Sequence, residues 1–380
     1  MASAPQPAVE QTSSRSDTVS VSYDLTRPLA IATKGIRTTN VRIERAANAH
    51  LADHVLVKAQ VSSVSTTLHG RLHARSSVTS DNEYSLALEV DSSLWDLGFT
   101  NAEVTVVLPA SDTAMEHPGI RIAVPSGAIG ATMLGNTSIR ALDLSTEHGP
   151  AHLSDVAVGT LKLAAHNGNI TVHDVCAQGA VEIVGKAAWM DIDDVKADTV
   201  TATSTDAIIS LKDIEAKIVA ASTSNARVGL GNIKAGTLTA STNNAEVFAN
   251  KIFVDVCEIK VTKGDIEGDW CPRKKLYLMT TEAKVAAQVQ IDSEALEMTL
   301  CSKHGPIQLD LPATFSGGFS LQTTGYYKTF IHTDSKVKAS PILHVSQPDH
   351  KVGMLSSGTA RHSLKAITEE APITVNFGSL

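Results

Sequence analysis

The sequence has few aromatic side chains. They make up 4% of its 380 residues, whereas hydrophobic residues of all kinds make up 43%. The core is therefore expected to be aliphatic, and β-branched side chains suit strands better than helices. No apolar run reaches the roughly 20 residues of a membrane-spanning helix, so no membrane span is predicted.

An excess of positive charge is also missing, because the formal net charge at pH 7 is −8. Non-specific binding to nucleic acid depends on a basic surface that neutralises phosphates. The sequence therefore predicts no nucleic-acid partner.

Cysteine is scarce, with four residues at 176, 257, 271 and 301. No two of them form a CxxC pair, so a zinc site is not indicated. Residues 1–17 are rich in Ser, Pro and Gln, and lack the basic start and apolar core of a secretory signal. We expect a disordered tail there, a cytoplasmic location, and cysteines that stay reduced.

The common catalytic and cofactor motifs are missing as well. The sequence contains no phosphate-binding loop, dinucleotide fingerprint or nucleophile elbow. We therefore expect no cofactor and no enzymatic activity.

What the sequence does contain is a repeat of 19 or 20 residues. Apolar anchor residues recur at this interval: Val156, Val175, Val195, Ile214, Ile233, Ile252 and Cys271. Four further columns, at 14, 12, five and three residues before each anchor, hold apolar or small residues in every copy. A repeat of this length is the signature of an elongated, repetitive fold.

Within each copy, apolar residues alternate with polar ones. Lys162 in one copy and Lys212 in a later copy lie between apolar neighbours, as do Thr171 and Ser210. Period-two alternation is typical of a strand with one buried face. The columns predict an all-β, parallel β-solenoid, expected to be right-handed, whose strands stack about 4.8 Å apart with small residues at the bends.

The repeat divides the chain into four expected parts. Residues 1–17 form the tail, 18–111 an N-terminal β region or cap, 112–333 the solenoid of about ten coils, and 334–380 a C-terminal closing segment. Caps are expected because an open end exposes unpaired backbone groups.

Several segments resemble a family of adhesin-like β-solenoids that carry the auto-transporter adhesin head-like domain. They are VTVVLP at 104–109, GNITV at 168–172, GPIQLDLP at 305–312, FSGGFSL at 315–321 and PITVNF at 372–377. The resemblance implies a solenoid over residues 100–378 and an adhesin-like binding role. It implies no catalytic residue, since the family has no general catalytic motif.

The first candidate site is a column of acidic residues directly before the anchors. Its members are Asp155, Asp174, Asp194 and Asp213, followed by Asn232. These residue types favour tight bends, so the column predicts a bend in each coil. The alternative is a calcium site, because stacked carboxylates repel one another unless a cation lies between them.

The second candidate is an outward patch formed by Asp191 and Asp193, with His173 and Lys212 on neighbouring copies. The two carboxylates lie about 7 Å apart along one face of a strand. The patch is interpreted as a charged sheet face used in binding. The alternative is a carbohydrate-active enzyme, a polysaccharide lyase or hydrolase, because paired carboxylates cleave glycosidic bonds.

The third candidate is a face rich in hydroxyl groups, formed by Thr201, Thr203, Ser222, Thr239 and Ser241. Such residues are common on exposed strands, and regular hydroxyl arrays also bind sugars. The sequence therefore favours a non-enzymatic scaffold that presents an extended surface to a protein or glycan, with self-association through the solenoid ends as a further possibility.

Overall fold

The structure is a computed structural model. It describes residues 9–12, 17–24, 26–34, 36, 38–46, 54–63, 72–80, 82–90, 100–109, 117–187, 189–324, 326–337, 340–356 and 361–379. Residues 1–8 and 13–16 of the expected tail lie outside this set. The described residues form 27 strands and no helix. None of them belongs to a helix long and apolar enough to cross a membrane.

The chain forms two compact units, each described by itself. The first unit comprises residues 1–189 with 195–197, and the second comprises residues 190–194 with 198–380. Stacked parallel strands form a β-solenoid of about 9 turns, against the ten expected. The all-β solenoid fold is thereby confirmed.

The first unit contains thirteen described strands. They are β1 (Val9–Thr12), β2 (Asp17–Asp24), β3 (Leu29–Lys34), β4 (Thr38–Arg45), β5 (His54–Ser63), β6 (Leu72–Val78), β7 (Tyr84–Val90), β8 (Thr100–Leu108), β9 (Ile120–Ser126), β10 (Ile129–His148), β11 (Ala151–Ala165), β12 (Ile170–Ala177) and β13 (Ala180–Gly185).

Strand β14 (Met190–Thr203) is divided between the units, and the rest lie in the second unit. They are β15 (Ile209–Ser222), β16 (Val228–Thr242), β17 (Val247–Val261), β18 (Ile266–Thr280), β19 (Val285–Val289), β20 (Glu297–Ser302), β21 (Ile307–Leu311), β22 (Gly317–Gln322), β23 (Thr329–Thr333), β24 (Ile342–Ser346), β25 (His350–Leu355), β26 (His362–Thr368) and β27 (Ile373–Phe377).

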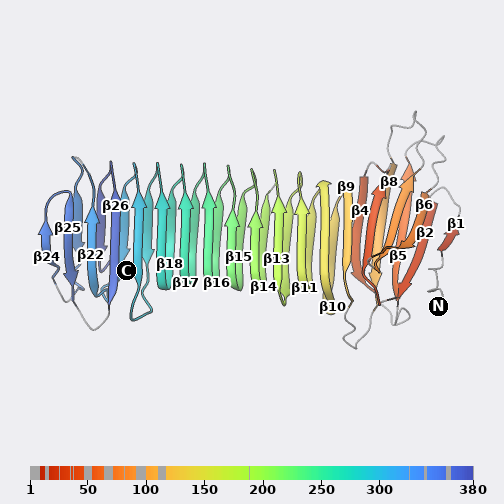
Figure 1. Cartoon of the computed structure of the whole chain (residues 1–380), viewed down its shortest axis with the longest axis horizontal. Helices are drawn as coiled ribbons and strands as arrows, with labels where there is room; N and C mark the ends of the chain where they lie inside the picture. Colours follow the sequence, from red (N-terminus) through yellow and green to blue (C-terminus); the bar gives the residue numbers. More distant parts are fainter. Residues whose placement is uncertain are drawn as a thin grey trace. The chain divides into compact units, whose positions relative to one another are not determined.

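The coils of the second unit stack at the interval that the sequence predicts. Strands β15 to β18 pair in parallel, with Ile209 beside Val228, Val228 beside Val247, and Val247 beside Ile266. Each step is 19 residues, so identical columns of successive copies lie side by side (Figure 1). The predicted repeat is confirmed.

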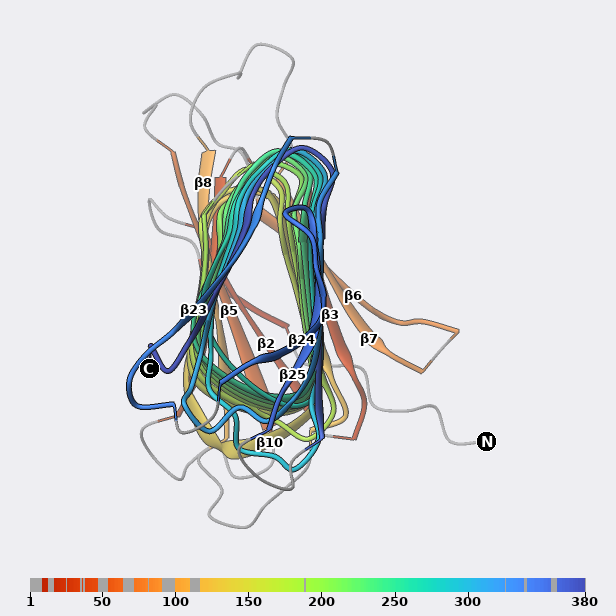
Figure 2. The same cartoon turned by 90° about the vertical axis from the view of Figure 1, so that its left-hand side faces the viewer.

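The core lies inside flattened coils. Seen end on, each coil runs along two long sides joined by bends (Figure 2). The predicted inward columns are buried, as Val219, Leu238 and Cys257 illustrate with 0% exposure. Aliphatic side chains from both sides therefore fill the narrow interior.

A buried hydroxyl column that the sequence interpretation missed closes one bend of the second unit. Each hydroxyl donates to the carbonyl oxygen of a small residue in the preceding coil: Thr223 to Ala207 at 3.3 Å, Thr242 to Ala226 at 3.0 Å and Thr280 to Gly264 at 3.0 Å. The small residue in this bend leaves room for the hydroxyl group. Burial of these carbonyl groups would be costly without a donor.

The repeat is interrupted between β17 and β18. Ala249 pairs with Gly268, but Ile252 then pairs with Trp270, so β18 lacks one residue at this bend. Trp270, at 1% exposure, takes the inward position that was predicted for Cys271. Cys271 is half-buried beside Phe253, and its prediction as an inward anchor was wrong because the deletion shifts the register.

At the N-terminal end of the first unit, strand order departs from chain order. Strands β3 and β4 lie between β7 and β8 on one side and β9 and β10 on the other, all in parallel. Beyond them, β5 pairs antiparallel with β8, and β6 pairs antiparallel with β7.

At the C-terminal end of the second unit, strand order also departs from chain order. Strands β26 and β27 lie between β20–β21 and β22–β23, so the last strands of the chain are inserted into the stack. The hairpin of β24 and β25 pairs antiparallel along β22. The segment 334–380 thus supplies one inserted coil and one terminal hairpin.

Candidate functional site

The acidic column forms a tight bend with left-handed backbone. The φ angles are 54° at Asp155 and 51° at Asp174 in the first unit, and 51° at Asp194, 52° at Asp213 and 50° at Asn232 in the second. Asp and Asn adopt this conformation more readily than other residues with a side chain. Backbone geometry therefore accounts for their recurrence, and the bend interpretation agrees with the structure.

Calcium binding by this column remains a prediction. Within the described parts of the chain, no three His, Cys, Asp or Glu side chains converge closely enough to hold a metal ion. In the second unit, Asn232 donates a hydrogen bond to Asp213. This bond, followed by that from Lys212, holds the pKa of the Asp213 carboxyl below its usual range.

The structure brings Lys212 together with Asp193. The Lys212 Nζ atom lies 3.4 Å from Asp193 Oδ1 and 3.1 Å from Asp213 Oδ2. The hydrogen bond to Asp213 and the charge of Asp193 raise the pKa of Lys212. One lysine therefore bridges two carboxylates on an exposed sheet face, where each ion pair contributes little to stability.

The other two members of the predicted patch, Asp191 and His173, are exposed and line neither of the pockets described below. Asp191 lies on β14, and His173 lies on β12 of the first unit. The carbohydrate-cleaving alternative for Asp191 and Asp193 stays a prediction.

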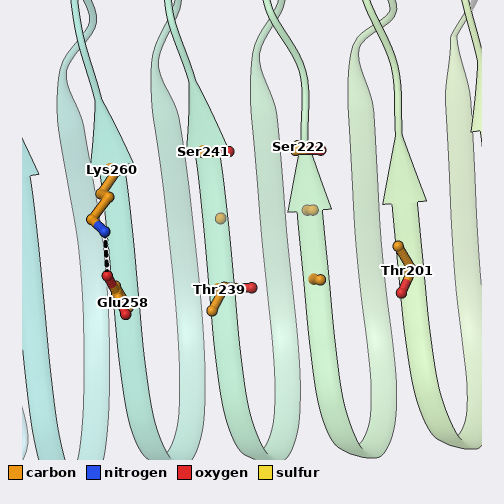
Figure 3. A pocket seen from close by; sticks show the side chains of 9 residues that line it. Thr201, Ser222, Thr239, Ser241, Glu258 and Lys260 are labelled. Carbon is orange, nitrogen blue, oxygen red and sulfur yellow. Dashed lines mark ion pairs between the residues drawn. The ribbon is translucent and has the colours of Figure 1, made fainter.

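The hydroxyl-rich face contains a shallow pocket of about 260 Å³ in the second unit. Its lining comes from four adjacent strands: Thr201, Ala220, Ala221, Ser222, Thr239, Ala240, Ser241, Glu258 and Lys260. Figure 3 shows Thr201, Thr239, Ser222 and Ser241 along neighbouring strands on this face. The pocket exists because small side chains lie between larger ones.

Charged and aromatic side chains border this pocket on one side. Lys260 Nζ lies 2.5 Å from Glu258 Oε1, the ion pair drawn in Figure 3. The same ammonium lies 5.9 Å from the centre of the Tyr277 ring. The hydrogen bond that Lys260 donates to Glu258 raises the pKa of Lys260, so this border of the pocket is an ion pair of two opposite charges.

A second pocket, which the sequence interpretation missed, lies in the first unit. It measures about 350 Å³ and is lined by Asn40, Val41, Arg42, Glu103, Ala128, Ile129, Gly130, Thr132, Pro150 and His152. These residues come from β8, β4, β10 and β11 and from the turns that precede β10 and β11. Because β8 lies beside β4 against chain order, no sequence interval links Glu103 to Asn40. The sequence signal for this pocket was Gly130, an isolated glycine within a strand of alternating inward and outward residues.

Comparison with known proteins gave a match to one family profile and to two solved structures. Residues 36–212 match the profile of the Toastrack DUF4097 family. The solved structure described as a "putative cell adhesion protein" from Clostridium sporogenes ATCC 15579 is 7% identical, with a TM-score of 0.21, over 98% of this chain and 100% of that one. A "putative adhesin" from Bacteroides fragilis NCTC 9343 is 10% identical, with a TM-score of 0.25, over 95% and 96%. The search of curated proteins gave no significant match.

Proposed function

We propose that this chain, whose residues 36–212 match the profile of the Toastrack family, is a non-enzymatic, adhesin-like scaffold. In this role it presents the outward faces of its coils to a protein or glycan partner. The rigid stack holds each outward side chain at a fixed place, which suits recognition over an extended surface.

The contrast between inward and outward positions of the same coils supports this proposal. Directly after the buried residues at the start of each strand, one outward row of the second unit reads Asp191, Ser210, Gly229, Phe248 and Glu267. The inward columns hold apolar or small residues in every copy, whereas this outward row varies in charge, size and polarity. The coils therefore share an apolar interior but present different side chains on their outward face.

A capture experiment tests the scaffold proposal. The tagged full-length protein is used to recover partners from its native host, in parallel with the variants Phe248→Ala and Thr239→Glu. Each variant changes one outward side chain on a different face and leaves the inward columns intact. We expect at least one variant to lose a partner while its melting temperature is unchanged. Recovery of no specific protein or glycan by the unaltered chain would contradict the proposal.

A further inference from the structure

Gly130 lines the bottom of the pocket in the first unit, and the fold does not require a glycine at this position. A Cβ atom added at Gly130 would meet only the carbonyl oxygens of Val41 and His152, both at 3.9 Å, which is ordinary contact. Its φ angle lies outside the left-handed region. A glycine inside a strand weakens it and often marks the close approach of another group. The open space above Gly130 therefore points to an occupant.

The dimensions of this space fit one small ring. Arg42 and His152 occupy the strands on either side of Gly130, in direct register with it. Two strand spacings separate them, which is about 10 Å. The volume of about 350 Å³ is at the small end of ligand pockets, which begin at about 300 Å³.

The polar groups around the rim include both donors and acceptors. The guanidinium of Arg42 only donates, the carboxylate of Glu103 only accepts, and the Thr132 hydroxyl does both. Glu44 Oε2 lies 2.9 Å from Arg42 Nε and orients the guanidinium. The Asn40 side-chain oxygen accepts from the backbone of Ala128 at 3.1 Å, which directs its amide nitrogen elsewhere.

Charge and apolar surface narrow the class of ligand. Arg42 and Glu103 carry opposite charges, so the lining disfavours a strongly charged ligand of either sign. Ala128 and Pro150 offer apolar contact beside the polar rim. A ligand with an apolar ring face and several hydroxyl groups satisfies all of these features.

We propose that this pocket binds one sugar ring of a neutral glycan. This inference deepens the proposed scaffold function by assigning it a glycan-binding site and its ligand class. The ring lies over Gly130, with its C–H face against Ala128 and Pro150, and its hydroxyl groups reach Arg42, Glu103 and Thr132.

Saturation-transfer NMR with the full-length protein tests the site. The probes are the methyl glycosides of glucose, galactose, mannose and N-acetylglucosamine, with glucuronate as the anionic comparison. We expect transfer to at least one neutral sugar. In the variant Gly130→Val, the saturation-transfer signal should fall at least tenfold, because the valine side chain fills the space above residue 130. The melting temperature of this variant should be unchanged or higher.

A matched control is Gly229→Val, another outward glycine in a strand, at which a Cβ atom meets only Ile209 O at 3.8 Å. This variant should bind as the unaltered protein does. Transfer to none of the neutral sugars, stronger transfer to glucuronate, or full binding by Gly130→Val would overturn the site. A protein partner recovered by capture would leave the scaffold function standing in each of these cases.

Discussion

The regular coils of the second unit and its C-terminal end use the same kind of strand but connect them differently. In β15 to β18, each strand lies beside the one that follows it in the chain, with a 19-residue step that is shortened by one residue only at the bend between β17 and β18. At the end, β26 and β27 enter the stack between strands whose paired residues precede theirs by 66 residues on one side and by 44 or 45 on the other. A repeated pattern makes neighbouring copies interchangeable, whereas the inserted coil depends on specific contacts.

Those contacts are concentrated in large side chains. Phe315, Phe319 and Phe377 pack together, with ring centres 5.4 and 5.9 Å apart, and the ring of His362 lies 5.7 Å from that of Phe315. Apart from Trp270 in β18, the buried hydrophobic residues of β15 to β18 carry no aromatic ring. Aromatic rings thus gather where the chain reverses its stacking order, and they bury a large apolar area at one place.

The largest effect is expected from Gly317→Ala, which breaks the inserted coil. The new Cβ atom would lie 2.0 Å from the carbonyl oxygen of His362, a backbone atom that cannot move without displacing β26. We expect a loss of about 3–4 kcal/mol in the free energy of unfolding. Hydrogen exchange should become faster in β26 and β27 while β15 to β18 stay protected.

The neighbouring residue provides the control for this substitution. A Cβ atom at Gly318 meets only Gly353 O, at 4.0 Å, so Gly318→Ala should leave exchange in β26 unchanged. Equal effects of the two substitutions would show that packing of β26 against Gly317 does not hold the end together.

The N-terminal irregular end should respond to acid through His117. This side chain is buried beside β10, accepts from the backbone N–H of Gly119 at 3.1 Å, and burial lowers its pKa from 6.5 to about 4. The folded protein disfavours the protonated imidazole of His117. The contribution of this residue to stability is therefore fully present above pH 6.5 and is lost as the pH falls from 6.5 to 4. The expected loss is roughly 3 kcal/mol.

Denaturant unfolding between pH 7 and 4 measures this slope. His117→Gln should flatten it, while substitution of the exposed His152 by Gln should not. His362, whose pKa burial also lowers, contributes in the same direction, so part of the slope should persist. A slope unaffected by His117→Gln would contradict the assignment.

A smaller effect is expected within the regular coils from Thr242→Val. The substitution keeps the shape of the side chain but removes the donor to Ala226 O, leaving a buried carbonyl group without a partner. We expect a loss of about 1–2 kcal/mol in denaturant unfolding. The outward-facing, half-buried Thr239 should tolerate Thr239→Val with a change in stability of less than about 0.5 kcal/mol.

The smallest effect concerns the left-handed bend. Lys251 takes the place of Asp or Asn in this column with a φ angle of 57°. Left-handed backbone costs a residue with an ordinary side chain about 1–2 kcal/mol, and less for Asn. Lys251→Asn should therefore raise the free energy of unfolding by about 0.5–1 kcal/mol, measured by denaturant unfolding. Asn232→Lys should lower it by a similar amount. A change of the reverse sign in either variant would refute this explanation.

The candidate sites were predictable to different degrees. The hydroxyl face could be found because its members recur at 19-residue intervals along β14 to β16, and the structure places Thr201 and Thr239 around one pocket. The link between Asp193 and Lys212 was predictable for the same reason. The pocket over Gly130 was not, because Arg42 and Glu103 belong to strands that lie together against chain order.

The sequence by itself determined the fold class, the step between coils, the inward columns and the acidic bend. Each of these depends on local alternation and on an interval that every copy repeats. The tertiary structure decided the order of strands at both irregular ends, the shift that buries Trp270, and the pocket of the first unit. These features depend on contacts between segments far apart in the chain, for which no periodic signal exists.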